Sequence, residues 1–204
     1  MKRFPIRPIV ACLLLFAVLT AVAAESSAPR ELVRGITDAV IKVLREKGMS
    51  ADDKRKRIED IVFDYVDFET TSRLVLAKHW RNLNEDQKTQ FIQEFRRHLS
   101  VTYGKNVESY QDETVTITGD RKEARGDSTV KTRIVRNGPN DILVDYRLRR
   151  KGNGWKIIDL IIERVSLVSN FRSQFQQIVA NDGIERLIDL LRKKNAAGES
   201  GLKS

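Results

Sequence analysis

The side chain that comes closest to a catalytic group in this sequence is Asp159, which lies inside the apolar segment WKIIDLII at residues 155–162. A carboxyl group in apolar surroundings can have a raised pKa and act as a general base. The same carboxylate could instead accept hydrogen bonds from the N–H groups of a helix, or pair with an arginine. We favour the structural role, and general-base catalysis stays open as the alternative.

The two histidines add little chemistry to this carboxylate. His79 lies beside Trp80 at the expected end of a helix, where a surface or helix-capping role is favoured. His98 lies in the polar run QEFRRHL, which predicts a solvated side chain. The sequence has no H-E-x-x-H, G-x-S-x-G, P-loop or dinucleotide glycine motif. We therefore expect no metal and no cofactor.

The N-terminal residues are typical of a secretory signal peptide. Lys2, Arg3 and Arg7 supply a positive start, and residues 9–19 form an apolar stretch that is short for a membrane span. Small residues at 21–24 then offer a cleavage site. We expect residues 1–23 to be removed on export, and an uncleaved membrane anchor is the alternative.

Export would leave a mature chain without cysteine, because the only cysteine is Cys12. Loss of three basic residues would lower the formal net charge from +9 to +6. A moderately basic exported protein favours anionic partners, such as lipid headgroups or acidic protein surfaces. Nucleic acid is not an expected partner, because the basic residues are scattered and form no recognised motif.

The periodicity of apolar residues predicts helices, then strands, then helices. Helical spacing covers residues 28–48, 50–65, 68–80 and 84–110, and it returns from Val168 with a break at Gly183. Alternation predicts strands over residues 113–118, 127–136, 141–150 and 155–162, with a turn beginning at Gly119. Short turns indicate antiparallel neighbours. The sequence therefore predicts an α+β fold, in which about six helices wrap a curled four-stranded meander, and a disordered tail over residues 196–204.

Strand 155–162 is apolar on both sides, which raises the question of what covers each face. On one side we expect Ile158, Leu160 and Ile162, and on the other Trp155, Ile157 and Ile161. The long helix carries a second apolar stripe. That stripe comprises Phe91, Phe95, Leu99 and Tyr103. The stripe and the sheet could enclose a cavity, or they could interlock as a dry core, which periodicity alone favours.

Two long stretches resemble a known family. They are FDYVDFETTSRLVLAKHWRNLNEDQKTQFIQEFRRHLSVTYGKNVESY (63–110) and GWKIIDLIIERVSLVSNFRSQFQQIVANDGIERLIDLL (154–191). The chain resembles the MlaC-type periplasmic phospholipid-binding proteins, also called toluene-tolerance or ABC-transporter auxiliary proteins, over about residues 30–195. In that family a glycine commonly separates the acidic residue from the valine before the SLV-type segment, whereas Arg164 stands there in this sequence.

The resemblance implies a phospholipid-binding domain over residues 28–195, built as an NTF2-like cone with a helical part. It implies a periplasmic, non-enzymatic carrier whose cargo is phospholipid. The carrier would shuttle lipid between an outer-membrane lipoprotein–porin complex and an inner-membrane ABC transporter complex, and so maintain outer-membrane lipid asymmetry. We expect a headgroup rim of Lys78, Arg164 and Arg172. The expected cavity lining is Val75, Leu76, Phe91, Phe95, Leu99, Tyr103, Ile117, Ile134, Val144, Tyr146, Ile161, Val165, Leu167 and Phe171.

Three alternatives remain at this point. A cone of helices on a curled sheet also suits a small enzyme that removes a proton from an apolar substrate, with Asp159 or Asp145 as the base. A hopanoid-related lipid carrier would share the same architecture. An adaptor that binds only proteins would have a dry core and no lipid.

The signal peptide leads to a direct prediction. Protein recovered from the periplasm should have an intact mass that corresponds to cleavage after Ala23 or Ala24. A chain that retains Met1, or that is found only in membranes, would contradict this expectation.

Overall fold

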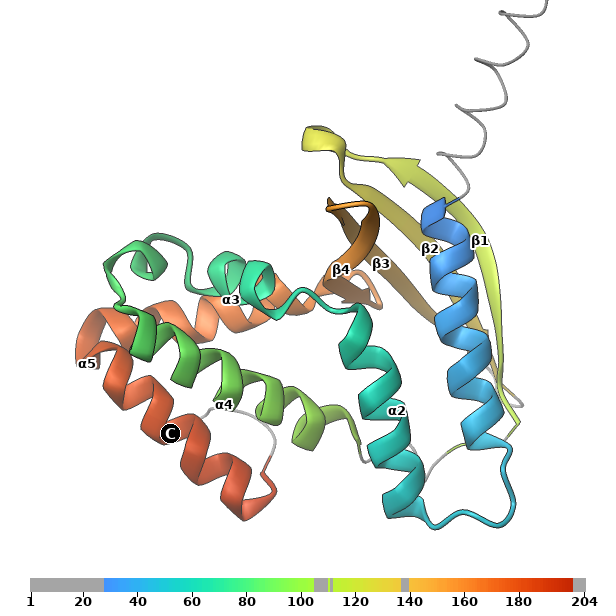
Figure 1. Ribbon diagram of the computed structural model, residues 1–204, viewed down its shortest axis with the longest axis horizontal. Helices are drawn as coiled ribbons and strands as arrows, with labels where there is room; N and C mark the ends of the chain where they lie inside the picture. The colour runs from blue at the N-terminus through green and yellow to red at the C-terminus, as the bar shows by residue number, and fades with distance from the viewer. Residues whose placement is uncertain (1–27, 105–109, 111, 137–139, 200–204) are drawn as a thin grey trace, which may run out of the picture.

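The computed structural model describes residues 28–104, 110, 112–136 and 140–199 (Figure 1). A helix over residues 28–44 comes first. The later helices are α2 (Ala51–Tyr65), α3 (Phe68–Leu76), the 3₁₀ helix η1 (Ala77–Asn82), α4 (Glu85–Tyr103), the 3₁₀ turn η3 (Ala124–Gly126) and α5 (Leu167–Ala197). The strands are β1 (Thr114–Lys122), β2 (Ser128–Val135), β3 (Ile142–Lys151), β4 (Gly154–Ile162) and β5 (Val165–Ser166). The expected signal peptide lies outside the described residues.

The strands form one antiparallel sheet in the order β1-β2-β3-β4-β5, which confirms the α+β class and the meander. β5 is a short addition to the four expected strands, and its Val165 pairs with Ile162. The turn expected at Gly119 is wrong. β1 continues to Lys122 because a β-bulge between Ile117 and Gly119 keeps the strand in register with β2.

Strand β4 contains a second bulge, and it changes the assignment of faces. Arg147 pairs with Asp159 and Leu148 pairs with Ile157, so Ile158 is an extra residue in β4. Paired residues in an antiparallel sheet point to the same face. The expected grouping of Ile158 with Leu160 and Ile162 is therefore wrong. The face that β4 shares with the apolar side of β3 consists of Trp155, Ile157, Leu160 and Ile162.

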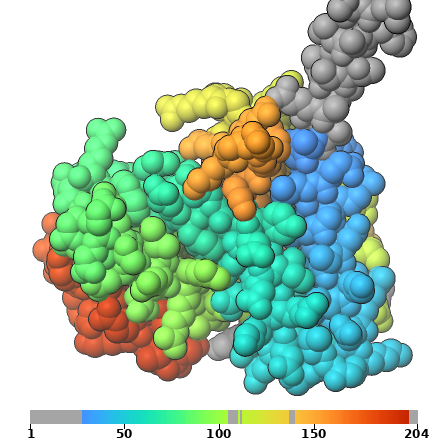
Figure 2. Space-filling model, in the orientation of Figure 1, coloured from blue at the N-terminus to red at the C-terminus, as the bar shows by residue number. Residues whose placement is uncertain are grey.

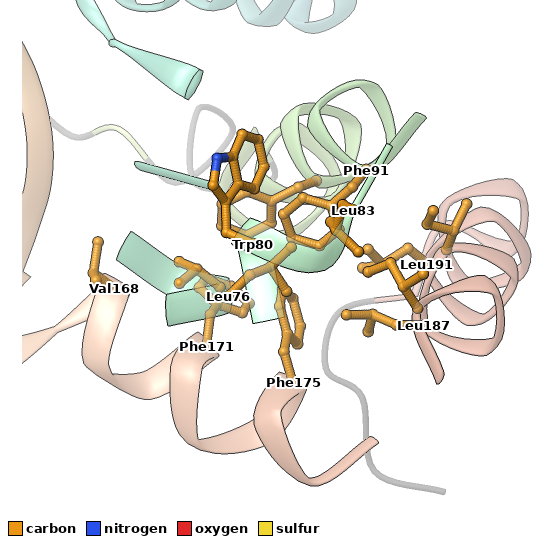
Figure 3. Close-up of a cluster of buried hydrophobic side chains, with 13 residues drawn as sticks. Leu76, Trp80, Leu83, Phe91, Val168, Phe171, Phe175, Leu187 and Leu191 are labelled. Atoms are coloured by element: carbon orange, nitrogen blue, oxygen red, sulfur yellow. The ribbon is translucent and has the colours of Figure 1, made fainter. Parts of the chain in front are cut away.

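Helices α3, η1, α4 and α5 form a lobe with its own aromatic core (Figure 3). Phe95 contacts Phe171 and Phe175 edge-on, with ring centroids 5.2 and 5.6 Å apart, and Phe91 contacts Phe175 at 5.8 Å. The Phe91 and Phe95 side chains are 0% and 1% exposed. The hypothesis that Phe91 and Phe95 meet the sheet is wrong, because both are buried against Phe171 and Phe175 of α5.

The second lobe is the sheet with the helix over residues 28–44 packed on one face (Figure 1). Val33 and Ile36 of that helix are buried against Val130, Leu148 and Ile157. The same face carries an ion pair between the helix and β1, in which Arg30 Nη1 lies 2.6 Å from Asp120 Oδ1. These contacts place the helix along the apolar side of the sheet.

Helix α5 bends in the middle, as the sequence predicts. Gly183 has φ 83° and ψ 172°, outside the helical region, and this divides α5 into two arms that enclose α4 (Figure 1). The two arms of α5 count as separate helices. Together with the helix over residues 28–44, α2, α3 and α4, they give the described chain the expected six helices. The expected tail boundary at residue 196 is wrong, because α5 continues through Ala197 to a left-handed cap at Gly198.

The helical core also holds His98, whose predicted exposure to solvent is wrong. His98 is 0% exposed, and its ring lies 5.9 Å from that of Phe171. Nδ1 lies 3.2 Å from Asn195 Oδ1, whereas the buried Nε2 has no hydrogen-bond partner. Burial lowers the pKa of His98 below its ordinary value, against the effect of Asn195, and the nearby Lys194 lowers it further. The buried site therefore favours the neutral form of the His98 imidazole.

This geometry predicts a pH dependence of stability. A folded-state pKa below the unfolded value of about 6.5 means that the stabilisation is complete above that pH and is lost as the pH falls. The free energy of unfolding should therefore fall between about pH 7 and about pH 5, before carboxyl groups titrate. In urea titrations at several pH values, His98→Gln should reduce the change in the free energy of unfolding with pH. His79→Gln is the matched control, and an equal reduction there would contradict the assignment.

Candidate functional site

The apolar side of the sheet is sealed at one end. Leu148 and its partner Ile157 are 0% and 2% exposed, in one buried cluster with Val33 of the helix over residues 28–44. In the neighbouring strand β2, Val130 is also fully buried. Around these three residues the face is close-packed protein.

Exposure rises along the strands away from that end. Tyr146 and Leu160 form the next cross-strand pair and are half-buried, and Val144 is 7% exposed beside a half-buried Ile162. Val165, paired with Ile162, is 55% exposed. We call the half-buried residues of this face on the Tyr146 side of Leu148 the inward apolar surface. They are Val115, Ile117, Ile134, Ile142, Tyr146, Leu160 and Ile162.

Helix α2 stands in front of this surface but is not packed into a core. None of its residues is buried, although it carries apolar side chains. Val62 contacts the sheet cluster, and Ile58 lies one turn earlier on the same side of the helix. In the space-filling view, α2 and the helix over residues 28–44 hide most of the strands (Figure 2). Helix α2 thus covers the inward apolar surface, but the side chains of that surface stay half-buried.

The polar groups on this surface are neutral. Thr132 donates a hydrogen bond from Oγ1 to the carbonyl oxygen of Val144 at 2.8 Å. Burial raises the pKa of Tyr146 to about 12. At physiological pH the inward apolar surface therefore presents hydrocarbon and neutral phenol, without a buried charge.

Asp159 lies on the other face of β4 and has a structural role, as favoured from the sequence. Its Oδ1 accepts the N–H of Val168 at 3.0 Å, and its Oδ2 accepts the hydroxyl of Ser166 at 2.6 Å. Arg147 Nη1 lies 3.7 Å from the same Oδ2. Both oxygens are engaged at the start of α5, and the residue is 4% exposed. Such a carboxylate fixes a helix and is poorly placed to accept a proton from a substrate.

Six of the predicted lining residues lie on the sheet, and four of them share its inward side. Ile117, Ile134, Val144 and Tyr146 point to that side, and Val165 lies at its exposed edge. Ile161 does not, because it pairs with Asp145 on the opposite face. The sequence analysis left out four members of the surface. Ile142 follows from the alternation of β3, and Val115 from that of β1, whereas Leu160 and Ile162 are obscured by the bulge at Ile158.

The remaining predicted residues lie in the helical lobe. Tyr103 is half-buried at the end of α4. The others belong to the aromatic core or pack against it. They are Val75, Leu76, Phe91, Phe95, Leu99, Leu167 and Phe171. The five buried ones, Val75, Leu76, Phe91, Phe95 and Phe171, pack inside the helical lobe, whereas a lining role for Leu99, Leu167 and Tyr103 stays a prediction.

Only one of the three expected rim cations adjoins the sheet. Arg164 lies in the β4–β5 turn beside Val165. Lys78 is in η1 of the helical lobe, and Arg172 donates from Nε to the carbonyl oxygen of Leu74 at 2.8 Å. The three cations lie on different elements, and their shared rim stays a prediction.

A search of the described residues for histidine, cysteine and acidic side chains finds no cluster that could hold a metal ion. Within the same residues, none of the helices combines the length and the apolar character that crossing a membrane requires.

Comparison with protein families gives a match over most of the chain. The model of the MlaC protein family matches residues 34–193. The chain belongs to the MlaC family. The toluene tolerance protein ttg2D of Pseudomonas putida is 24% identical over 204 residues, covering 94% of this chain and 95% of the relative. The intermembrane phospholipid transport system binding protein MlaC of Haemophilus influenzae is 21% identical over 145 residues, covering 68% and 67% of the two chains.

A solved structure shares the fold of this MlaC-family chain. The phospholipid-binding protein from Ralstonia solanacearum, determined in complex with a phospholipid, superimposes with a TM-score of 0.74. The two sequences are 22% identical, and the match covers 82% of this chain and 97% of the other.

The MlaC-family chain keeps a tight turn where the family commonly has glycine. Glu163 and Arg164 have φ values of 49° and 67°, in the left-handed region that glycine adopts without strain. Glu163 is held across the sheet by Leu143, which accepts its N–H at 2.9 Å and donates to its Oε1 at 2.6 Å. These two hydrogen bonds hold the local bend.

The difference between the sealed and open ends can be tested by added bulk. Leu148→Trp should lower the free energy of unfolding by about 1–3 kcal/mol, because the site is filled. Ile162→Trp, on the same face, should cause a smaller loss, because its neighbours leave room. Urea titrations of both variants make the comparison. Equal losses would show that the inward apolar surface is close-packed as well.

Proposed function

We propose that this protein is a carrier that binds phospholipid with the acyl chains against the inward apolar surface. The observation that carries the proposal is the contrast within one face of the sheet. Leu148 and Ile157 are sealed by protein, whereas Tyr146, Leu160 and Ile162 keep exposed hydrocarbon behind α2. Family membership supports the proposal, as does the shared fold with a protein solved with a phospholipid bound.

The cost of moving a free lipid through water explains why a carrier is needed. Exposing an acyl chain costs about 0.8 kcal/mol per methylene. A chain of about 16 carbons therefore costs roughly 12 kcal/mol, and two chains about twice that. A protein that covers the chains removes most of this penalty. The inward apolar surface, with its neutral Tyr146, suits hydrocarbon and opposes a buried charge.

We infer further that the carrier works in the periplasm without catalysing a reaction. Its partners would be an outer-membrane lipoprotein–porin complex and an inner-membrane ABC transporter complex, and its role the maintenance of outer-membrane lipid asymmetry. The predicted signal peptide supports the location. The names of two relatives, a toluene tolerance protein and an intermembrane phospholipid transport binding protein, support the pathway. Engagement of both Asp159 oxygens by Val168 and Ser166 argues against the general-base alternative.

The test is the lipid content of protein purified without detergent. Organic extraction and mass spectrometry should find phospholipid in a fixed ratio to protein. Ile162→Trp should lower that ratio, because the indole occupies space meant for hydrocarbon. Leu148→Trp is the matched control, and its folded fraction should keep the lipid.

The same extract distinguishes the remaining possibilities. A hopanoid in place of phospholipid would correct the cargo and keep the carrier. Repeated absence of stoichiometric lipid from the wild-type protein would contradict the carrier and favour a protein-only adaptor.

A further inference from the structure

Helices α2 and α4 face each other through polar side chains, which is unusual for neighbouring helices. A cleft of about 690 Å³ lies between them. Asp52, Arg55, Lys56 and Glu59 line it from α2, at the spacing of one helical stripe. The opposing stripe of α4 comprises Gln93, Arg96, Arg97, Ser100 and Val101. We call this polar contact the α2–α4 seam.

Among the described residues, the side-chain contacts across the seam include a hydrogen bond and a stacked guanidinium. Ser100 donates a hydrogen bond from Oγ to Glu59 Oε2 at 2.5 Å. The guanidinium of Arg96 lies over the ring of Phe63 at 4.7 Å and over that of Phe68 at 5.5 Å. On its other side α4 is joined to α5 by the aromatic core. Solvated polar contacts separate at a much smaller cost than a packed apolar core.

Both ends of α2 are fastened to the sheet lobe. Near its start, Lys54 donates from Nζ to the carbonyl oxygen of Leu44 at 2.7 Å. At its end, Lys156 Nζ donates to the carbonyl oxygen of Asp64 at 2.5 Å. The N–H of Asp67 then bonds to the carbonyl oxygen of Ile157 at 2.9 Å. We therefore expect α2 to move together with the sheet, and α4 to move together with the helical lobe.

The two lobes are joined firmly on the opposite side, through β4. Thr71 of α3 donates from Oγ1 to the carbonyl oxygen of Ile158 at 3.3 Å, and Asp159 holds the N–H of Val168 at the start of α5. These contacts are buried. A relative rotation of the lobes about the β4 junction would therefore open the α2–α4 seam first.

We propose that the α2–α4 seam is the portal through which lipid enters and leaves. This inference rests on the proposed carrier function. Val62 lies seven residues after Arg55, beside the seam stripe of α2, and contacts the sheet cluster, so parting α2 from α4 uncovers the hydrocarbon chains sideways along their length. Lys56 and Arg97, exposed on the two walls, give the phosphate of a headgroup a polar path while the tails stay inside.

The test closes the seam with a reversible cross-link. The expected mature chain has no cysteine, because Cys12 lies in the signal peptide. Glu59→Cys with Ser100→Cys places one thiol on each wall, at side chains now 2.5 Å apart. A short bismaleimide with a cleavable disulfide joins them. Gln87→Cys with Glu185→Cys is the matched control, because these residues also touch at 2.5 Å but connect α4 to α5 within one lobe.

Each protein is mixed with vesicles of phosphatidylcholine that contain isotopically labelled phosphatidylethanolamine. After re-isolation, mass spectrometry measures how much labelled lipid the protein has taken up. The Glu59–Ser100 cross-link should keep the original lipid bound and reduce uptake to background, and cleavage by thiol should restore uptake. The same variant before cross-linking controls for folding. The Gln87–Glu185 cross-link should leave uptake unchanged.

A third cross-link tests the competing exit at the open end of the sheet. Arg45→Cys with Tyr110→Cys joins the end of the helix over residues 28–44 to Tyr110, where Arg45 Nε and the Tyr110 hydroxyl lie 3.2 Å apart. This cross-link should permit uptake. The portal is refuted if the Glu59–Ser100 cross-link leaves uptake unchanged, or if the Arg45–Tyr110 cross-link alone abolishes it. Wild-type protein that never holds lipid would refute the carrier itself.

Discussion

Strand β4 packs against a different set of helices on each of its faces, and the rest of the fold depends on this double packing. One face meets the helix over residues 28–44 through Ile157, and the other meets α3 and α5 through Asp159 and the buried Ile158. The bulge at Ile158 allows this, because it shifts the alternation by one residue partway along the strand. Leu160 and Ile162 thereby remain on the apolar side after Asp159 has turned toward α5.

This arrangement divides the apolar residues into a core that is complete and a surface that is not. The phenylalanines of α4 and α5 pack against one another, so their burial requires no ligand. The sheet has fewer partners, because one helix covers its sealed end and α2 contributes no buried side chain. Half-buried hydrocarbon inside a protein is costly in water. A lipid that occupies such a site stabilises the protein while the protein shields the lipid.

The same division shapes the motions that the protein can make. Contacts across β4 are buried hydrogen bonds, whereas those across the α2–α4 seam are a part-buried hydrogen bond and a guanidinium over two rings. A hinge needs one firm side and one weak side. A carrier needs to shield its cargo and still release it, and a polar seam beside an apolar interior meets both requirements.

The sequence by itself determined the α+β class, the meander, the break at Gly183 and the inward side of β3, because these follow from local periodicity and turn residues. It also favoured Asp159 as a structural acceptor. Only the tertiary structure decided that Phe91 and Phe95 face α5, that His98 is buried, and that Ile162 shares a face with Val144. Periodicity identifies which residues of one element share a face, but a bulge or a choice between two possible partners depends on long-range packing, which no local pattern records.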